Sequence, residues 1–146
     1  MASATYDPLL VLVSFKGIPI SGYADGTFVK SERNEALFTQ KVGAAGEVAR
    51  ARSRNMTGKI TLTLLASSPI NDLLSACYML DEATNLGFGS FFIKELGGTT
   101  VAMAPCAYIE KLPSVEYAKE VGQREWVFLC DQLIENVGGL VGIAID

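Results

Sequence analysis

The sequence predicts a mainly β fold, a β-sandwich or partly closed barrel with one α-helix packed against it, and three observations predict it. Short segments of alternating polar and apolar residues recur along the chain and are separated by glycine-containing turns. One segment has the apolar spacing of three and four residues that is typical of a helix. The 146 residues, 49% of them hydrophobic, are enough for a single domain over residues 1–146 with its own core.

The first half of the chain contains the strands that are easiest to recognise. The apolar run LLVLVSF, a turn at Lys16-Gly17 and a second short apolar run that ends in GYADG predict a hairpin. Residues 27–33 alternate as a strand, and ALFTQKV extends or follows it. The clearest strand is GKITLTLLAS, in which alternate residues face a buried core and water. The residues expected on its core side are Ile60, Leu62 and Leu64.

The period changes at residues 67–69, where a helix is expected to begin and to continue to about residue 82. A serine N-cap, Pro69 at the first helical position and Asp72 in the first turn are start signals of a helix. This spacing predicts a helix that packs on a sheet, because the opposite face carries little charge. Its expected apolar stripe consists of Ile70, Leu73, Leu74, Cys77 and Leu80.

Three further strands are expected after the helix. The segments SFFIKEL and TTVAMAPCAYIEKL form two of them and meet across a turn at Gly97-Gly98. REWVFLCDQLIEN, residues 124–136, is expected to be one long last strand. The segment VEYAKEV at residues 115–121 is an additional candidate for an edge strand or a hairpin arm.

The composition excludes most catalytic chemistry, so we expect a protein that is not an enzyme and needs no cofactor or metal. The chain contains no histidine, which removes the commonest general base, the commonest metal ligand and every histidine-activated nucleophile. Cys77, Cys106 and Cys130 lie in apolar surroundings without a CxxC pair, which favours buried free thiols. GAAGEVAR lacks the spacing of a phosphate-binding loop. The apolar run near the N-terminus is too short for a membrane segment.

Two long stretches resemble one protein family when they are taken together and in order. They are GYADGTFVKSERNEALFTQKVGAAGEVARARSRNMTGKITLTLLASSPINDLLSACY and the later VEYAKEVGQREWVFLCDQL. Both resemble the tail-tube proteins of contractile-tailed bacteriophages, and the resemblance spans most of the chain. It implies a β-sandwich subunit with one helix that forms hexameric rings, whose strands join into a barrel around a lumen.

The resemblance implies a structural virion protein whose rings stack helically into the inner tail tube. Such a tube conducts double-stranded DNA into the host without binding it specifically, and its partners are the tail sheath and the baseplate. The expected location is the virion tail, after assembly in the host bacterial cytoplasm. Two alternatives stay open: a tube protein of a contractile bacteriocin or bacterial injection system, and a small-molecule-binding β-barrel.

The segment at about 40–55 is expected to be a long basic loop that contacts a neighbouring subunit. Its four cations and one glutamate give it a net charge of +3, so the rest of the chain, at −4 in total, carries −7. That acidic remainder argues against tight nucleic-acid binding and favours self-association. A solvated flexible loop is the alternative interpretation. The expected contact residues are Lys41, Gly43, Gly46, Arg50, Arg52 and Arg54.

A tube for DNA also needs an inner wall that does not hold phosphate, so its wall should be neutral and polar or acidic. The polar sides of residues 58–67 and of the preceding strand are the candidates. The candidate lumen-facing residues are Lys30, Glu32, Lys59, Thr61 and Thr63. The two lysines among them require a neighbour's carboxylate for neutrality.

Overall fold

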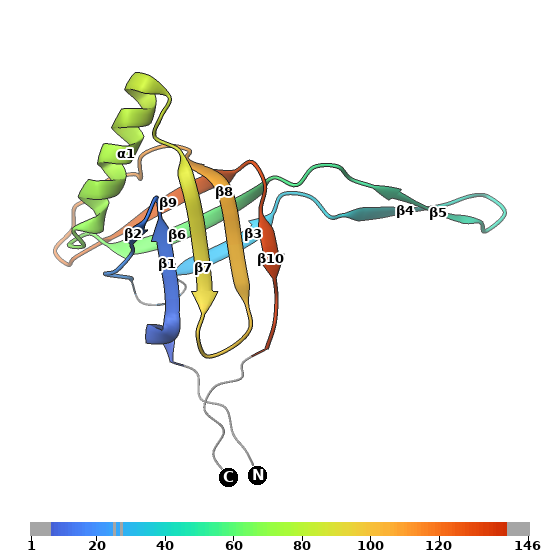
Figure 1. Ribbon diagram of the computed structural model, residues 1–146, viewed down its shortest axis with the longest axis horizontal. Helices are drawn as coiled ribbons and strands as arrows, with labels where there is room; N and C mark the ends of the chain where they lie inside the picture. Colours follow the sequence, from blue (N-terminus) through green and yellow to red (C-terminus); the bar gives the residue numbers. More distant parts are fainter. Residues whose placement is uncertain (1–6, 25, 27, 140–146) are drawn as a thin grey trace, which may run out of the picture.

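The computed structural model describes residues 7–24, 26 and 28–139 (Figure 1). Within these residues the chain is mainly β and contains a single α-helix, as predicted. The elements in order are a 3₁₀ helix at Pro8–Leu10, β1 Val11–Phe15, β2 Ile18–Pro19, β3 Val29–Arg33, β4 Phe38–Val42, β5 Val48–Arg52, β6 Gly58–Leu65, α1 Ile70–Thr84, β7 Gly89–Glu95, β8 Val101–Ile109, β9 Gln123–Cys130 and β10 Ile134–Asn136.

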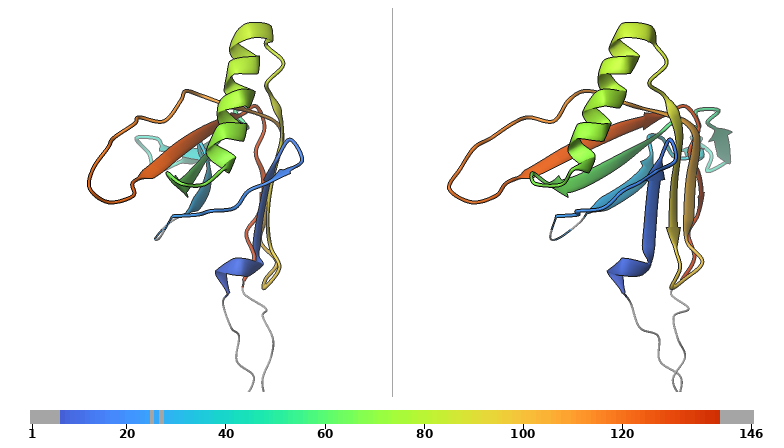
Figure 2. Two further views of the ribbon diagram at one scale, coloured as in Figure 1. Left: turned by 90° about the vertical axis from the view of Figure 1, so that its left-hand side faces the viewer. Right: turned by 60° about the vertical axis from the view of Figure 1, so that its left-hand side comes forward.

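Eight strands form one antiparallel sheet in the order β2-β1-β7-β8-β9-β6-β3, and β10 adds to β8. Strand β8 divides this sheet, because its first residues pair with β10 and only residues 107–109 pair with β9. We call β2, β1, β7, β8 and β10 the β7 leaf, and β9, β6 and β3 the β6 leaf. The leaves cross at an angle, with the helix at one end (Figure 2). The sheet is not closed, which agrees with the predicted sandwich or partly closed barrel.

The core lies between the two leaves. The rings of Phe15, Phe91 and Phe128 pack with centroids 4.8 to 5.9 Å apart, and each side chain is fully buried. On β6 the predicted alternation is confirmed, since Ile60, Leu62 and Leu64 are buried and the residues between them are half-buried. Burial of large aromatic and aliphatic side chains is the main stabilising contribution to such a fold.

Both predicted hairpin turns are confirmed. Lys16 and Gly17 have φ angles of 52° and 79°, the positive values that a two-residue type I′ turn requires. The Gly97-Gly98 segment joins β7 to β8. Residue 27, the predicted start of the third strand, lies outside the described residues, and the strand itself is β3.

The prediction of one strand over residues 124–136 is wrong. The chain bends at residues 131–132 and forms two strands, β9 in the β6 leaf and β10 in the β7 leaf. Leu133 is fully buried directly after the bend, where the chain passes from one leaf to the other. The candidate strand at residues 115–121 is also absent from the described structure, which places that segment in an irregular, exposed connection.

The helix is confirmed with different ends and a narrower buried face. It begins at Ile70, with Pro69 at the N-cap position, and Ser68 Oγ accepts a hydrogen bond from the Ile70 amide at 3.3 Å. Of the predicted stripe, Ile70 and Leu74 are buried and Cys77 is half-buried. Leu73 and Leu80 are exposed, so the stripe is wrong there. Leu73 lies on an uncovered side of the first turn, next to the buried Leu74, and the later part of the helix extends past the end of the sandwich (Figure 1).

The single tryptophan and one of the three thiols belong to the core. Trp126 is 1% exposed, and its Nε1 donates a hydrogen bond to Asn71 Oδ1 at 2.9 Å, which links β9 to the helix. The three cysteines are free thiols. The prediction of buried thiols holds for Cys130, where burial raises the pKa to about 11, whereas Cys77 and Cys106 are half-buried.

Candidate assembly surfaces

The most conspicuous candidate site is a β-hairpin that projects from the sandwich (Figure 1). Strands β4 and β5 form their own two-stranded sheet, and every residue of both strands is exposed. The strand expected at ALFTQKV is confirmed as β4, whereas the long loop expected at about 40–55 is wrong, because β4 continues to Val42 and residues 48–52 form β5. The two strands are instead a regular ribbon with no other element of the described structure packed on it.

The two glycines predicted as contact residues serve the turn of this hairpin. The Gly46 amide donates to the Gly43 carbonyl at 3.0 Å, and the Gly43 amide donates to the Glu47 backbone carbonyl at 2.7 Å. Gly46 has a φ angle of 87°, which a side chain disfavours. This pattern is a type I turn followed by a left-handed residue, a common three-residue hairpin loop. The geometry of the turn is therefore sufficient to account for the glycine at position 46, and no contact with a neighbouring subunit is needed to explain it.

The four predicted cations do not share one surface. Directly opposed residues of an antiparallel pair point to the same face, so Arg50 and Arg52 lie on one face, opposite Gln40 and Phe38. Lys41 lies on the other face, and Arg54 follows the end of β5. The structure thus brings together two of the three arginines that the sequence grouped.

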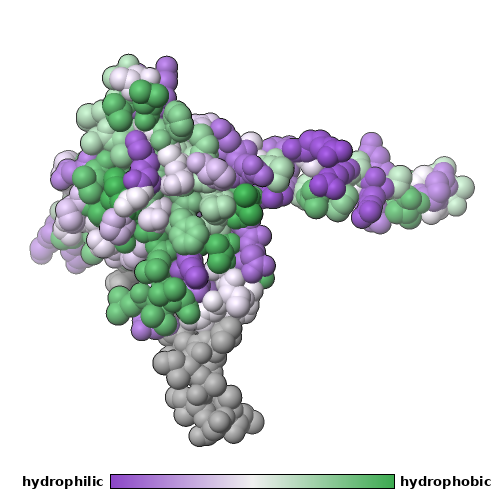
Figure 3. Space-filling model, viewed as in Figure 1, coloured by the Kyte–Doolittle hydropathy of each residue, from purple (hydrophilic) through white to green (hydrophobic). Residues whose placement is uncertain are grey.

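The arginine-bearing face, which we call the arginine face, also carries apolar side chains. Phe38 lies under the guanidinium of Arg50, with Cζ 4.4 Å from the ring centroid. Val42 and Val48 are opposed near the tip and are 67% and 60% exposed. Figure 3 shows polar and apolar side chains mixed along the whole ribbon. A two-stranded hairpin is at best marginally stable in water, so this ribbon needs a surface to cover it.

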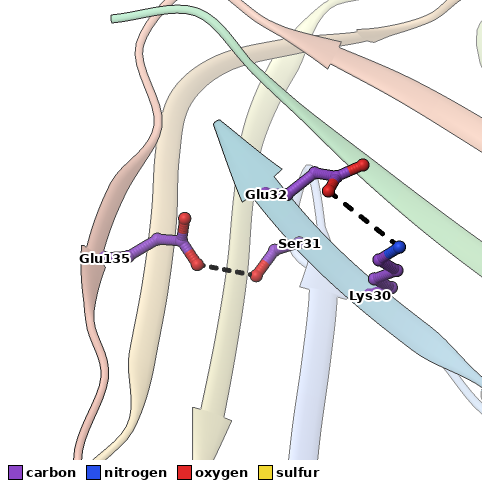
Figure 4. Close-up of polar contacts among 4 residues, drawn as sticks. All are labelled: Lys30, Ser31, Glu32 and Glu135. Carbon is purple, nitrogen blue, oxygen red and sulfur yellow. Dashed lines mark hydrogen bonds and ion pairs between the residues drawn. The ribbon is translucent and has the colours of Figure 1, made fainter. Parts of the chain in front are cut away.

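The second candidate surface is the outer face of the β6 leaf, on which all five predicted lumen-facing residues come together. Lys30 is opposite Thr61, Glu32 is opposite Lys59, and Thr63 lies further along β6. Lys30 Nζ and Glu32 Oε2 are 3.9 Å apart (Figure 4), and both side chains are more than half exposed. An exposed pair of this kind contributes little to stability.

Sequence reasoning missed one acidic member of this face. Glu125 on β9 is opposite Thr63 and points to the same side of the leaf. The face therefore carries two lysines and two glutamates, and their charges balance within one chain. Nothing in the sequence indicated this pairing, because the two strands are separated by about sixty residues and by the helix.

Metal and membrane chemistry receive no support from the described residues. They contain no group of three or more histidine, cysteine or acidic side chains placed to hold a metal ion. Among them no helix has the length and apolar character that a membrane crossing requires.

The sequence of this chain matches one protein family and one curated phage protein. The model of a family described as "Bacteriophage PhiTE tail tube protein" matches residues 12–138. A curated relative, "Structural protein ORF10" of Pseudomonas phage KPP10, is 27% identical over 122 residues, which cover 82% of this chain and 70% of the relative.

Two solved structures share the fold. The tube-terminating cap of the anti-feeding prophage is 14% identical to this chain, with a TM-score of 0.55. The matched region covers 92% of this chain and 93% of the cap chain. The chain from the sheath-tube complex of PVC, an extracellular contractile injection system in its extended state, is 12% identical. The matched region covers 90% of this chain and 91% of the PVC chain, with a TM-score of 0.58. At these identities the likeness concerns the fold alone.

Proposed function

Because this chain belongs to the family described as bacteriophage PhiTE tail tube protein, we propose that its copies close into hexameric rings that stack helically into the inner tail tube. The chain is a structural component of a phage virion and not an enzyme. In this proposal the tube conducts double-stranded DNA during ejection. The subunits would assemble in the host bacterial cytoplasm.

The observation that carries the proposal is the fully exposed β4–β5 hairpin. An element that projects from one copy and binds a different surface of the next copy makes a heterologous contact, which generates rings or helical stacks. The opposite charges of the hairpin and of the remaining chain favour a contact between copies. The open edges of the sheet at β2 and β3 offer further sites at which strands of neighbouring copies can join.

We assign the outer face of the β6 leaf to the lumen. Its two lysines and two glutamates leave no net charge on the wall. Duplex DNA carries one negative charge about every 1.7 Å of its axis, so a wall with excess cations would hold the DNA by releasing counterions. A balanced wall allows the duplex to slide through.

The outside of such a tube would contact the tail sheath, and its end would contact the baseplate. The solved sheath-tube complex of PVC contains a chain of the same fold within a sheath. Exposed apolar residues of the helix, which include Leu73, Met79 and Leu80, are available for an outer contact. No cofactor enters this proposal.

A tube protein of a contractile bacteriocin or injection system is the second candidate, because the two structures compared above come from such particles. The phage family and the phage relative favour the virion tail. The small-molecule-binding barrel, in contrast, predicts a monomer or dimer and gives no role to the hairpin.

Electron microscopy of the purified full chain tests the proposal. We expect long tubes of uniform width with a central channel. A variant in which residues 38–52 are replaced by a Gly-Ser linker should stay folded and should form no tubes. A wild-type protein that remains a monomer or dimer at high concentration would contradict the proposal.

A further inference from the structure

A groove follows the open side of the sandwich, between strand β1 with its β2 hairpin and the free edge of β3. Two adjoining cavities of about 770 and 430 Å³ form it, and both are lined by Val11, Gly26 and Phe28. The larger cavity is mainly apolar, with Leu9, Leu12, Ile20 and Tyr23 among its walls. This part of the groove offers a hydrophobic surface at the unpaired edge of a sheet.

The smaller cavity contains one acidic side chain, Glu95. Oε1 of this residue is buried without a hydrogen-bond partner among the described residues. Ser31, also in its wall, donates from Oγ to Glu135 Oε2 at 2.9 Å (Figure 4). In the described part of the chain, no lysine or arginine nitrogen lies within 4.0 Å of either carboxylate. A buried carboxylate oxygen without a donor is costly, so this end of the groove favours a cationic ligand.

We propose that the groove binds the β4–β5 hairpin of a second copy of this chain, with Glu95 and Glu135 accepting hydrogen bonds from its arginines. The inference rests on the proposed tube function and specifies the receptor of the hairpin. The hairpin of the same copy projects away from the sandwich (Figure 1), and none of its residues lines either cavity.

The arginine face and the groove present apolar and charged groups in the same order. On the arginine face, Val42 and Val48 lie at the tip, and Arg50 and Arg52 follow towards the base. Along the groove, an apolar cavity is followed by one whose wall contains the Glu95 carboxylate. With the tip in the larger cavity, the valines lose their exposure to water, and the guanidinium groups reach the carboxylates in the geometry that arginine favours.

A disulfide cross-link tests this register directly. We would introduce Val48→Cys at the hairpin tip and Leu12→Cys in the larger cavity, assemble the full chain and oxidise it. The groove contact predicts a ladder of disulfide-linked multimers on a non-reducing gel. The matched control pairs Val48→Cys with Val115→Cys, an exposed position outside the groove, and should give no ladder.

Tubes of the Leu12→Cys, Val48→Cys variant that yield no ladder would overturn the groove contact and leave the tube function standing. If this variant fails to assemble, hydrogen exchange on wild-type tubes decides. Slower exchange than in the unassembled protein at residues 38–52 and also at 28–31 supports the contact. Slowing at 38–52 alone overturns it, and no slowing at either segment rejects both proposals.

Discussion

The sandwich and the projecting hairpin use the same antiparallel pairing, but they differ in how deeply their side chains are buried. In the sandwich, strand residues such as Phe91 and Trp126 are almost completely buried between the leaves. In the hairpin, every strand residue is exposed. Backbone pairing alone does not stabilise a two-stranded ribbon in water. The sandwich is therefore stabilised within one chain, whereas the hairpin has no covering surface in the described part of the chain.

The largest effect on stability is expected from Trp126→Ala in the sandwich. The substitution leaves a cavity between the leaves and removes the hydrogen bond to Asn71, so the free energy of unfolding should fall by about 3 to 5 kcal/mol. Urea unfolding of the unassembled protein measures this change.

Phe38→Ala on the hairpin is the matched aromatic control and should leave the free energy of unfolding almost unchanged. Equal losses in the two variants would show that the hairpin belongs to the same cooperative unit as the sandwich, against the distinction drawn here.

A smaller difference in the free energy of unfolding is expected between two glycine-to-alanine substitutions, one in the sandwich and one in the hairpin. A Cβ at Gly58 would lie 2.5 Å from side-chain atoms of Leu133, so Gly58→Ala should cost about 1 to 3 kcal/mol through overpacking. Gly46→Ala strains a positive φ but meets no atom within 4 Å. Because the hairpin adds little to the stability of a single copy, unfolding of the Gly46→Ala variant should resemble the wild type. A comparable loss in both variants, measured by denaturant titration, would refute this.

Much of the sandwich could be predicted from the sequence, because buried and exposed residues alternate along its strands and this alternation is visible in the sequence. The alternation in β6 predicted its buried face and, with β3, the grouping of Lys30, Lys59 and Thr61 on one surface. The turn residues Lys16 and Gly17 predicted the first hairpin. The break between β9 and β10 could not be predicted, because a strand that changes its partner keeps the same apolar pattern.

The candidate sites were only partly predictable for the same reason. An exposed ribbon buries neither face, so β5 lacks a pattern of burial, and its segment was interpreted as a loop, whereas β4 falls within the strand expected at ALFTQKV. Glu125 reaches the outer face of the β6 leaf through pairing between distant strands, and Glu95 Oε1 is left without a hydrogen-bond partner by burial in the folded chain. A single sequence reveals neither. Leu80 matched a core stripe, but the helix extends beyond the surface that would bury it.

The central claim is that the hairpin acts in assembly and not in folding, and replacing Arg50, Arg52 and Arg54 by Glu tests it most directly. The matched control replaces Lys94, Lys111 and Lys119 by Glu, which changes the net charge equally outside the hairpin. Circular dichroism measures folding, and sedimentation measures tube formation. We expect the hairpin variant to be folded and to sediment as single subunits, because like charges then face the acidic partner surface, while the control still forms tubes. Normal tubes from the folded hairpin variant would contradict the claim.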